Sequence, residues 1–332
     1  VEVRDRDEAV ARSLTGPGAA AASVIAVLFS AFQLFTAYAG AFPDLIQRSI
    51  HMAFAIVLGF LMYAATGRSP RKRPSAVDVF SMVLGLIVCV YAASNYDRIM
   101  MNPGISNRWD LVLGIVATGL VLEATRRILN WILPAIAVLT ILYAYFGPYF
   151  PDALAHRGFS VDYILETLYM STSGLWGTVT GVSATVVAGF LIFGSILYYT
   201  GGGEIFVDLA KAIAGRSYGG PAKVSCISSA LFGTISGSAV ANVVVDGVFN
   251  IPLMKRLKYR PEFAAAVEAT ASTGGQLVPP VMGAGAFIMA ELTSTPYLKI
   301  ALAASIPALL YYIGVASSVH FEARKSGLER IP

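Results

Sequence analysis

The sequence predicts an all-α integral membrane protein, a multi-span helical bundle with a re-entrant helical hairpin and a discontinuous helix. Of its 332 residues, 56% are hydrophobic and only 13% are charged, against about 25% charged residues in soluble domains. The hydrophobic residues gather in blocks of about 20, the number of helical residues that crosses a bilayer core of roughly 30 Å. A soluble protein of this length would show shorter amphipathic elements instead.

We expect about eight spans along the chain. Seven are uninterrupted apolar blocks, at 20–42, 50–66, 77–94, 109–125, 130–147, 179–200 and 299–318. The eighth is an irregular block at 262–291. Two shorter segments, 161–170 and 204–214, place their apolar side chains on one helical face. We expect these to be helices that lie in the membrane interface or brace the bundle.

The apolar segment 222–254 is expected to enter and leave the membrane on the same side. As one helix it would be about 50 Å long, too long for a single span, whereas two arms of about 22–25 Å are too short to cross. Its middle, Gly233–Ser238, consists mainly of small and polar residues suited to a turn. Charge agrees: with a hairpin here and the N-terminus in the cytoplasm, 19 of the 24 Lys and Arg residues lie inside, as the positive-inside rule requires.

The segment 262–291 is expected to form two half-helices. Pro280 has no backbone N–H and its ring clashes with the preceding turn, while Gly274 and Gly275 let the chain leave the helix at little steric cost. Free backbone groups at mid-membrane are tolerated only where they are buried in protein or line a cavity. Secondary transporters build sites for Na⁺ and anionic substrates from such half-helices.

The hairpin tip and the helix break therefore supply a candidate site for an ion and a substrate. Its residues are Ser236, Gly237, Ser238, Asn242, Asp246, Ser272, Thr273, Gly274, Gly275, Gln276 and Pro279. Hydroxyl, amide and carbonyl oxygens suit a hard cation. The Na⁺ candidates among these residues are Ser236, Ser238, Asn242, Thr273 and Gly275. Helix N-termini near Ala239 and Val281 favour a carboxylate. The alternative is that the small residues serve helix packing and that Pro279 only kinks a helix.

Other polar residues receive less weight. Asp246, in the second arm of the hairpin, is a carboxylate within the membrane and so a candidate for binding a cation or a proton. The alternative is that it pairs with a partner outside this chain or lies near the interface. Glu268 lies one turn before the break, where it could approach the site, but a structural role is favoured. The two cysteines lie in apolar blocks and the three histidines show no metal-ligand spacing, so neither a disulfide framework nor a metal centre is expected.

The sequence predicts neither an enzyme nor a nucleic-acid-binding protein. It contains no nucleophile–base arrangement and no phosphate-binding loop, and its basic residues adjoin the spans. No cofactor is expected other than Na⁺ as a coupling ion.

Several long motifs resemble the large permease domain of tripartite ATP-independent periplasmic (TRAP) transporters. They are GTISGSAVANVV at 233–244 and IPLMKRLKYRPEFAAAVEATASTGGQLVPPVMGA at 251–284. With LEATRR at 122–127 and GPYFPDALAHRGFS at 147–160, they are most similar to the fused permeases that pair with the TAXI type of solute-binding protein.

The resemblance implies three parts: a small four-helix membrane domain at 1–128, a connecting helix and interfacial segment at 129–178, and the first repeat of the large transport domain at 179–332. It implies an elevator-type, Na⁺-coupled importer of organic acids in the bacterial or archaeal cytoplasmic (inner) membrane. Its expected partners are an extracytoplasmic TAXI-type binding protein, the lipid bilayer, and the second, inverted repeat of the large domain, which the chain does not reach.

Two other functions are compatible with these patterns. A stand-alone ion-coupled carboxylate carrier would have no need of the N-terminal accessory domain. A non-transporting membrane scaffold would have no use for broken helices at mid-membrane.

Overall fold

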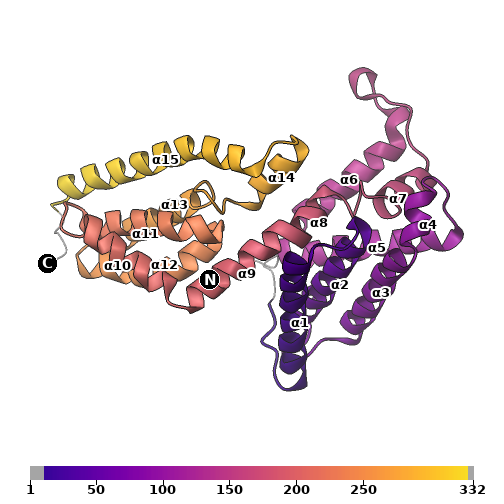
Figure 1. Ribbon diagram of the computed structural model, residues 1–332, viewed down its shortest axis with the longest axis horizontal. Helices are drawn as coiled ribbons and strands as arrows, with labels where there is room; N and C mark the ends of the chain where they lie inside the picture. Colours follow the sequence, from indigo (N-terminus) through magenta and orange to yellow (C-terminus); the bar gives the residue numbers. More distant parts are fainter. Residues whose placement is uncertain (1–10, 328–332) are drawn as a thin grey trace. The chain divides into compact units, whose positions relative to one another are not determined.

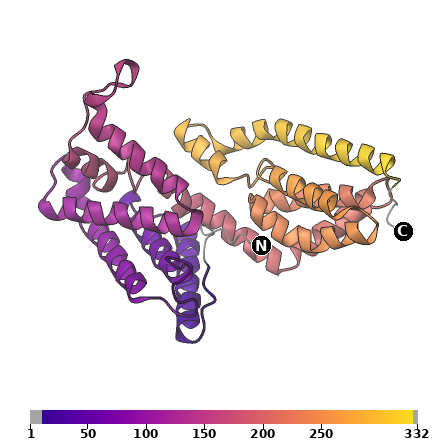
Figure 2. The same ribbon diagram turned by 180° about the vertical axis from the view of Figure 1, so that it is seen from behind.

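The protein consists of two helical units that divide between Thr185 and Val186, as seen in a computed structural model that describes residues 11–327. Within these residues the regular elements are helices (Figures 1 and 2), apart from one isolated bridge between Ala11 and Tyr63. The predicted all-α class is confirmed. The predicted segment boundaries at 128/129 and 178/179 stay predictions.

The first unit is built from eight α-helices in the described residues. They are α1 (Pro17–Ala39), α2 (Asp44–Met62), α3 (Ala76–Ser94), α4 (Tyr96–Met101), α5 (Arg108–Leu129), α6 (Ile132–Phe146), α7 (Val161–Tyr169) and α8 (Thr178–Val182). Short 3-10 turns lie at Gly147–Tyr149 and Asp152–Leu154, and a π-helical turn at Ser183–Val187.

The core of the first unit lies between α2, α3 and α5 and is closed by two aromatic side chains. Tyr169 and Trp176 are almost fully buried in it. The Tyr169 hydroxyl donates to the Val88 carbonyl at 2.8 Å, and the Trp176 indole N–H donates to the Tyr169 carbonyl at 2.7 Å. Both polar groups are therefore satisfied, so the two rings bury their apolar surface without an unpaired donor.

An ionic cluster lies where α3 begins. Asp78 forms a capping box with Ser75, so the start of α3 is fixed by the sequence. The same carboxylate, fully buried, accepts hydrogen bonds from Arg12 and Arg127. Arg12 also donates to the carbonyl of Phe60 at the end of α2. One carboxylate thus joins the N-terminal segment to α2, α3 and α5.

A second ionic cluster lies at the other end of the same helices. Asp110 forms a capping box with Asn107 at the start of α5. Its carboxylate accepts from Arg98 at 2.6 and 2.8 Å and from the hydroxyl of Tyr91, near the end of α3, at 2.8 Å. The pair α3 and α5 is therefore antiparallel, with an ionic cluster at each end.

The π-helical turn Ser183–Val187 is held by polar side chains of α2. Gln47 donates to the Ala184 carbonyl at 3.0 Å, and His51 lies 3.1 Å from the Ser183 hydroxyl. Gln33 of α1 bonds the other ring nitrogen of His51 at 2.7 Å. The side chain of His51 is therefore part of the packing of the first unit.

The second unit contains seven helices in the described residues. They are α9 (Ala188–Tyr199), α10 (Gly202–Ala214), α11 (Gly220–Ser236), α12 (Ala239–Arg256), α13 (Pro261–Gly274), α14 (Ala284–Leu292) and α15 (Tyr297–Lys325). Helices α11 and α12 form a hairpin, α13 packs against both arms, and α15 runs along α11 and α13 (Figure 2). The predicted hairpin and the predicted helix break are both present.

Six helices in the described residues are long and apolar enough to cross a membrane. They are Pro17–Ala39, Asp44–Met62, Ala76–Ser94, Ile132–Tyr149, Thr178–Tyr199 and Tyr297–Lys325. Two of the eight expected spans are not among them. Helix α5 has charged residues in both its first and last turns, such as Asp110 and Arg127, and the block 262–291 is divided between α13 and α14.

Candidate functional site

The tip of the hairpin is a turn at Gly237 and Ser238, the two residues between α11 and α12. Helix α11 ends at Ser236, Gly237 has a left-handed conformation with φ 57°, and Ser238 is the N-cap of α12. The Ser238 hydroxyl accepts from the Ala241 N–H at 3.3 Å. A Cβ on Gly237 would lie 2.5 Å from the Met282 carbonyl oxygen, so both the backbone conformation and the close approach require glycine.

The break between α13 and α14 is a loop held by hydrogen bonds between its own backbone groups. Helix α13 ends at Gly274 and α14 begins at Ala284. The Leu277 N–H donates to the Gly274 carbonyl and the Gly283 N–H donates to the Gln276 carbonyl, each at 2.9 Å. These bonds replace part of the helical pattern that the two prolines interrupt.

The hairpin tip and the helix break are in direct contact. The Val281 N–H donates to the Thr234 carbonyl at 3.1 Å. A Cβ on Gly233 would lie 2.4 Å from the Gly275 Cα, so the backbones of α11 and the break touch without side chains between them. Two clusters that lie about 40 residues apart in the sequence are thus adjacent in space.

Three of the predicted site residues lie at this contact. Asn242 is fully buried and donates to the Ser229 carbonyl at 2.8 Å. A Cβ added to Gly275 would lie 2.7 Å from the Asn242 Nδ2, so this amide packs directly on the Gly275 backbone. Gly237, at the hairpin tip, lies close to the carbonyl groups of Val281 and Met282 in the helix break. Ser236 and Ser238 flank Gly237, with the Ser238 N–H 3.5 Å from the Ser236 hydroxyl.

The other predicted residues, on α13 and in the helix break, do not face this contact. The hydroxyl of Thr273 donates back to the Ala269 carbonyl and its side chain is exposed. Ser272 donates to Glu268 at 3.0 Å. Gly274 packs on the ring of Tyr311. Gln276 is exposed and Pro279 is half-buried.

One predicted helix start is displaced. Helix α12 begins at Ala239 as expected, but α14 begins at Ala284 and not near Val281. The Val281 N–H is bonded to the hairpin tip and the Gly283 N–H to Gln276. These amides hold the break closed, so the second half-helix starts beyond them.

Asp246 is fully buried. It lies on the same face of α12 as Asn242, one turn further from the tip. Neither Lys255 nor Lys258 forms a salt bridge with it among the described residues. A salt bridge from Asp246 to either of these lysines is therefore excluded.

Glu268 is more central than the sequence suggested. It is fully buried. Its carboxylate accepts hydrogen bonds from side chains of α11, α12 and α13, namely Ser225, Ser229, Asn250 and Ser272. The signal for this cluster was helical spacing: Asn242, Asp246 and Asn250 recur every four residues on one arm, and Glu268 and Ser272 are four apart on α13.

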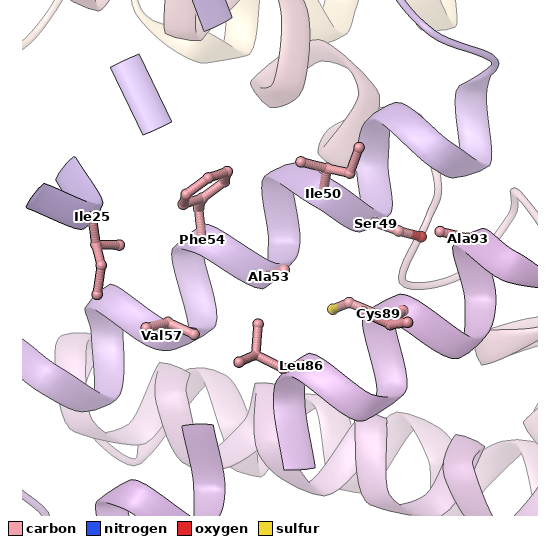
Figure 3. Close-up of a pocket in the computed structure, with 10 residues that line it drawn as sticks. Ile25, Ser49, Ile50, Ala53, Phe54, Val57, Leu86, Cys89 and Ala93 are labelled. Carbon is pink, nitrogen blue, oxygen red and sulfur yellow. The ribbon is translucent and has the colours of Figure 1, made fainter. Parts of the chain in front are cut away.

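An apolar cavity in the first unit lacks the features of a polar ligand site. It has a volume of about 380 Å³ and lies beside α2 and α3 (Figure 3). Ser49 and Cys89 supply the only hydroxyl and thiol groups of its lining, while Phe54, Val57 and Leu86 are typical of the rest. No group of polar side chains converges on it, so the hairpin and the helix break remain the candidate site.

Known proteins are similar to this chain over the same region. The family described as the tripartite ATP-independent periplasmic transporter, DctM component, matches residues 116–332. This match begins before the predicted boundary at 128/129 and includes the hairpin and the helix break.

Three relatives show the extent of the similarity. The sialic acid TRAP transporter large permease protein SiaM of Vibrio cholerae is 29% identical over 156 residues, which cover 47% of this chain and 36% of SiaM. The C4-dicarboxylate TRAP transporter large permease protein DctM of Pseudomonas aeruginosa is 30% identical over 143 residues, or 43% of this chain and 33% of the relative. Its namesake in Vibrio cholerae is 28% identical over 180 residues, or 54% and 38%.

The chain spans about a third of the length of the curated relatives it matches. The family match nevertheless covers more than half of the chain and contains every predicted site residue. The chain therefore belongs to the family of the DctM component of tripartite ATP-independent periplasmic transporters, a transport component and not an enzyme.

Proposed function

We propose that this chain is part of the permease of a Na⁺-coupled TRAP transporter that imports organic acids delivered by a solute-binding protein of the TAXI type. It works in the bacterial or archaeal inner membrane with its N-terminus in the cytoplasm. The observation that carries the proposal is the contact between the hairpin tip and the helix break. Backbone groups that leave their helices at such a contact are the ligands from which secondary transporters build ion sites.

Helix-end charge and the names of the relatives support a carboxylate substrate. Half-helix N-termini carry a partial positive charge that favours a carboxylate, and α12 and α14 both begin beside the contact. The relatives are named for C4-dicarboxylates and sialic acid. We expect a carboxylate substrate for this transporter too.

The test uses the complete transporter, including the rest of the large domain, in proteoliposomes. The Ser238→Ala and Gly275→Val variants should weaken Na⁺-dependent uptake, because one removes a hydroxyl oxygen and the other displaces Asn242. Ser318→Ala, an exposed serine on α15, is the matched control. Unchanged Na⁺ dependence in both site variants would contradict the assignment.

The partner is tested in the same vesicles. A purified TAXI-type binding protein added outside should be required for uptake. Full uptake without any binding protein would favour the stand-alone carrier, and no uptake with any carboxylate under a Na⁺ gradient would favour the scaffold.

A further inference from the structure

The facing sides of α11, α12 and α13 enclose a layer of buried polar side chains below the hairpin tip. Asp246 of α12 and Glu268 of α13 are both fully buried in it. The side chain of Glu268 lies against the backbone of α12 next to Asp246, since a Cβ on Gly247 would come 3.3 Å from its Cγ. Two carboxylates therefore share one interior space.

The hydrogen-bond donors of this layer are directed to Glu268. Ser225 donates to its Oε2 at 2.8 Å and Asn250 donates to the same oxygen at 3.3 Å. Ser272 and Ser229 donate to Oε1 at 3.0 and 3.4 Å. Four donors stabilise the ionised form of this carboxylate and oppose the cost of its burial.

Asp246 has less support. Ser228 and Ser229 are its neighbours, but their hydroxyls donate to the Ser225 carbonyl and to Glu268. Both carboxylate oxygens of Asp246 lack a hydrogen-bond partner within the described residues. So does the side-chain oxygen of Asn250, one turn along α12 on the same face, whose Nδ2 is fixed by Glu268 and Ser228.

No Lys or Arg side chain between residues 11 and 327 forms a salt bridge with either carboxylate. The salt bridges that the described part of the second unit forms, Lys211 with Asp208 and Arg260 with Glu322, include neither Asp246 nor Glu268. The unpaired atoms of the layer are all oxygen acceptors. A proton on Asp246 would supply a single donor for these three acceptor oxygens, whereas a hard cation accepts several oxygen ligands at once.

We propose that Asp246, Asn250 and Glu268 bind a Na⁺ ion between α12 and α13. The site is distinct from the hairpin tip, because Ser238 and Asp246 are separated by about 12 Å along α12. The inference rests on the proposed Na⁺-coupled transport and adds a second, carboxylate-based ion site to it. A bound cation offsets the cost of ionising the two buried carboxylates, and the amide oxygen of Asn250 completes its ligands.

The test measures Na⁺ binding to the purified complete transporter, with choline replacing Na⁺ at constant ionic strength. Radioactive ²²Na⁺ gives the number of bound ions, and the thermal unfolding midpoint gives the apparent affinity. The Asp246→Asn variant should lose one bound Na⁺ and require roughly tenfold or more Na⁺ for the same thermal shift, which is one decade in dissociation constant. Asp208→Asn, an exposed carboxylate on α10, is the matched control.

A second variant keeps the proposal testable if Asp246→Asn does not fold. Ser238→Ala leaves the carboxylate layer intact, so this protein should still bind at least one Na⁺. Na⁺ binding by Asp246→Asn equal to wild type in number and within about twofold in affinity, or no Na⁺ binding by Ser238→Ala, overturns the proposal. Failure of the proposed Na⁺-coupled transport is distinguishable from failure of this ion site. It would be seen with the wild-type transporter in vesicles, as uptake that does not depend on the Na⁺ gradient.

Discussion

The substitution Gly233→Ala tests whether the hairpin and the helix break must touch. A Cβ at this position would lie 2.4 Å from the Gly275 Cα and 3.0 Å from its carbonyl oxygen. Carbon atoms pack best at roughly 3.5–4.0 Å, so α11 and the break have to separate by about 1 Å or more. The obstacle is backbone, which cannot turn away as a flexible side chain would.

The expected magnitude follows from two opposing effects. Overpacking of this kind costs about 1–3 kcal/mol, while alanine is preferred over glycine inside a helix by about 1 kcal/mol. The net loss of stability is about 0–2 kcal/mol, small enough for the protein to fold. If the cost of separation falls on the Na⁺-bound state, apparent Na⁺ affinity should drop by about 5- to 150-fold, since 1.4 kcal/mol is a factor of ten.

The assay is the Na⁺ concentration that gives half-maximal uptake by the complete transporter in proteoliposomes. Gly314→Ala is the matched control, because it lies inside α15 and an added Cβ there meets nothing within 4 Å. It should keep wild-type Na⁺ dependence. A half-maximal Na⁺ concentration for Gly233→Ala within about twofold of the control would refute the reasoning, since the contact would then be dispensable.

Three further perturbations test the rest of the structure. Asp78→Ala leaves two buried guanidinium groups without their shared carboxylate. It should cost about 3–5 kcal/mol of stability, measured as a large fall in the thermal unfolding midpoint. A fall no greater than that of the exposed Asp97→Ala would be inconsistent with the cluster. Asn107→Ala removes a helix cap and should cost about 1 kcal/mol, so its midpoint should fall less than that of Asp78→Ala, and an unchanged midpoint would argue against the cap. Cysteines placed at Lys223 and Lys258 should both react with an impermeant reagent from the cytoplasmic side, whereas reaction on opposite sides would make the hairpin a full crossing.

The hairpin and the helix break could be predicted from the sequence because each follows from local rules. The segment 222–254 is too long for one span and too short for two, and a glycine lies at the turn that requires φ 57°. The break follows from adjacent glycines and a proline, which act on the backbone whatever surrounds them.

The role of Glu268 could not be predicted in the same way. Its environment depends on how α13 rotates against the hairpin, and that rotation is decided by packing at Gly233, Gly247 and Gly275. Periodic spacing placed Glu268 and Ser272 on one face, but it did not say which face would turn inward. The π-helical turn at Ser183–Val187 was also missed, because its partners Gln47 and His51 lie more than 130 residues away.

The distance between the two ionic clusters of the first unit can be compared with the thickness of a lipid bilayer. From Asp110 to Arg127, α5 rises about 26 Å, and both charged side chains are held by partners on α3. A typical hydrocarbon core is roughly 30 Å thick. A shortfall of this size is met by thinning of the surrounding lipid, at fractions of a kcal/mol per Å. If α5 lies across the bilayer with an ionic cluster at each face, lipids with shorter acyl chains should match this unit better than longer ones, because they need less local thinning.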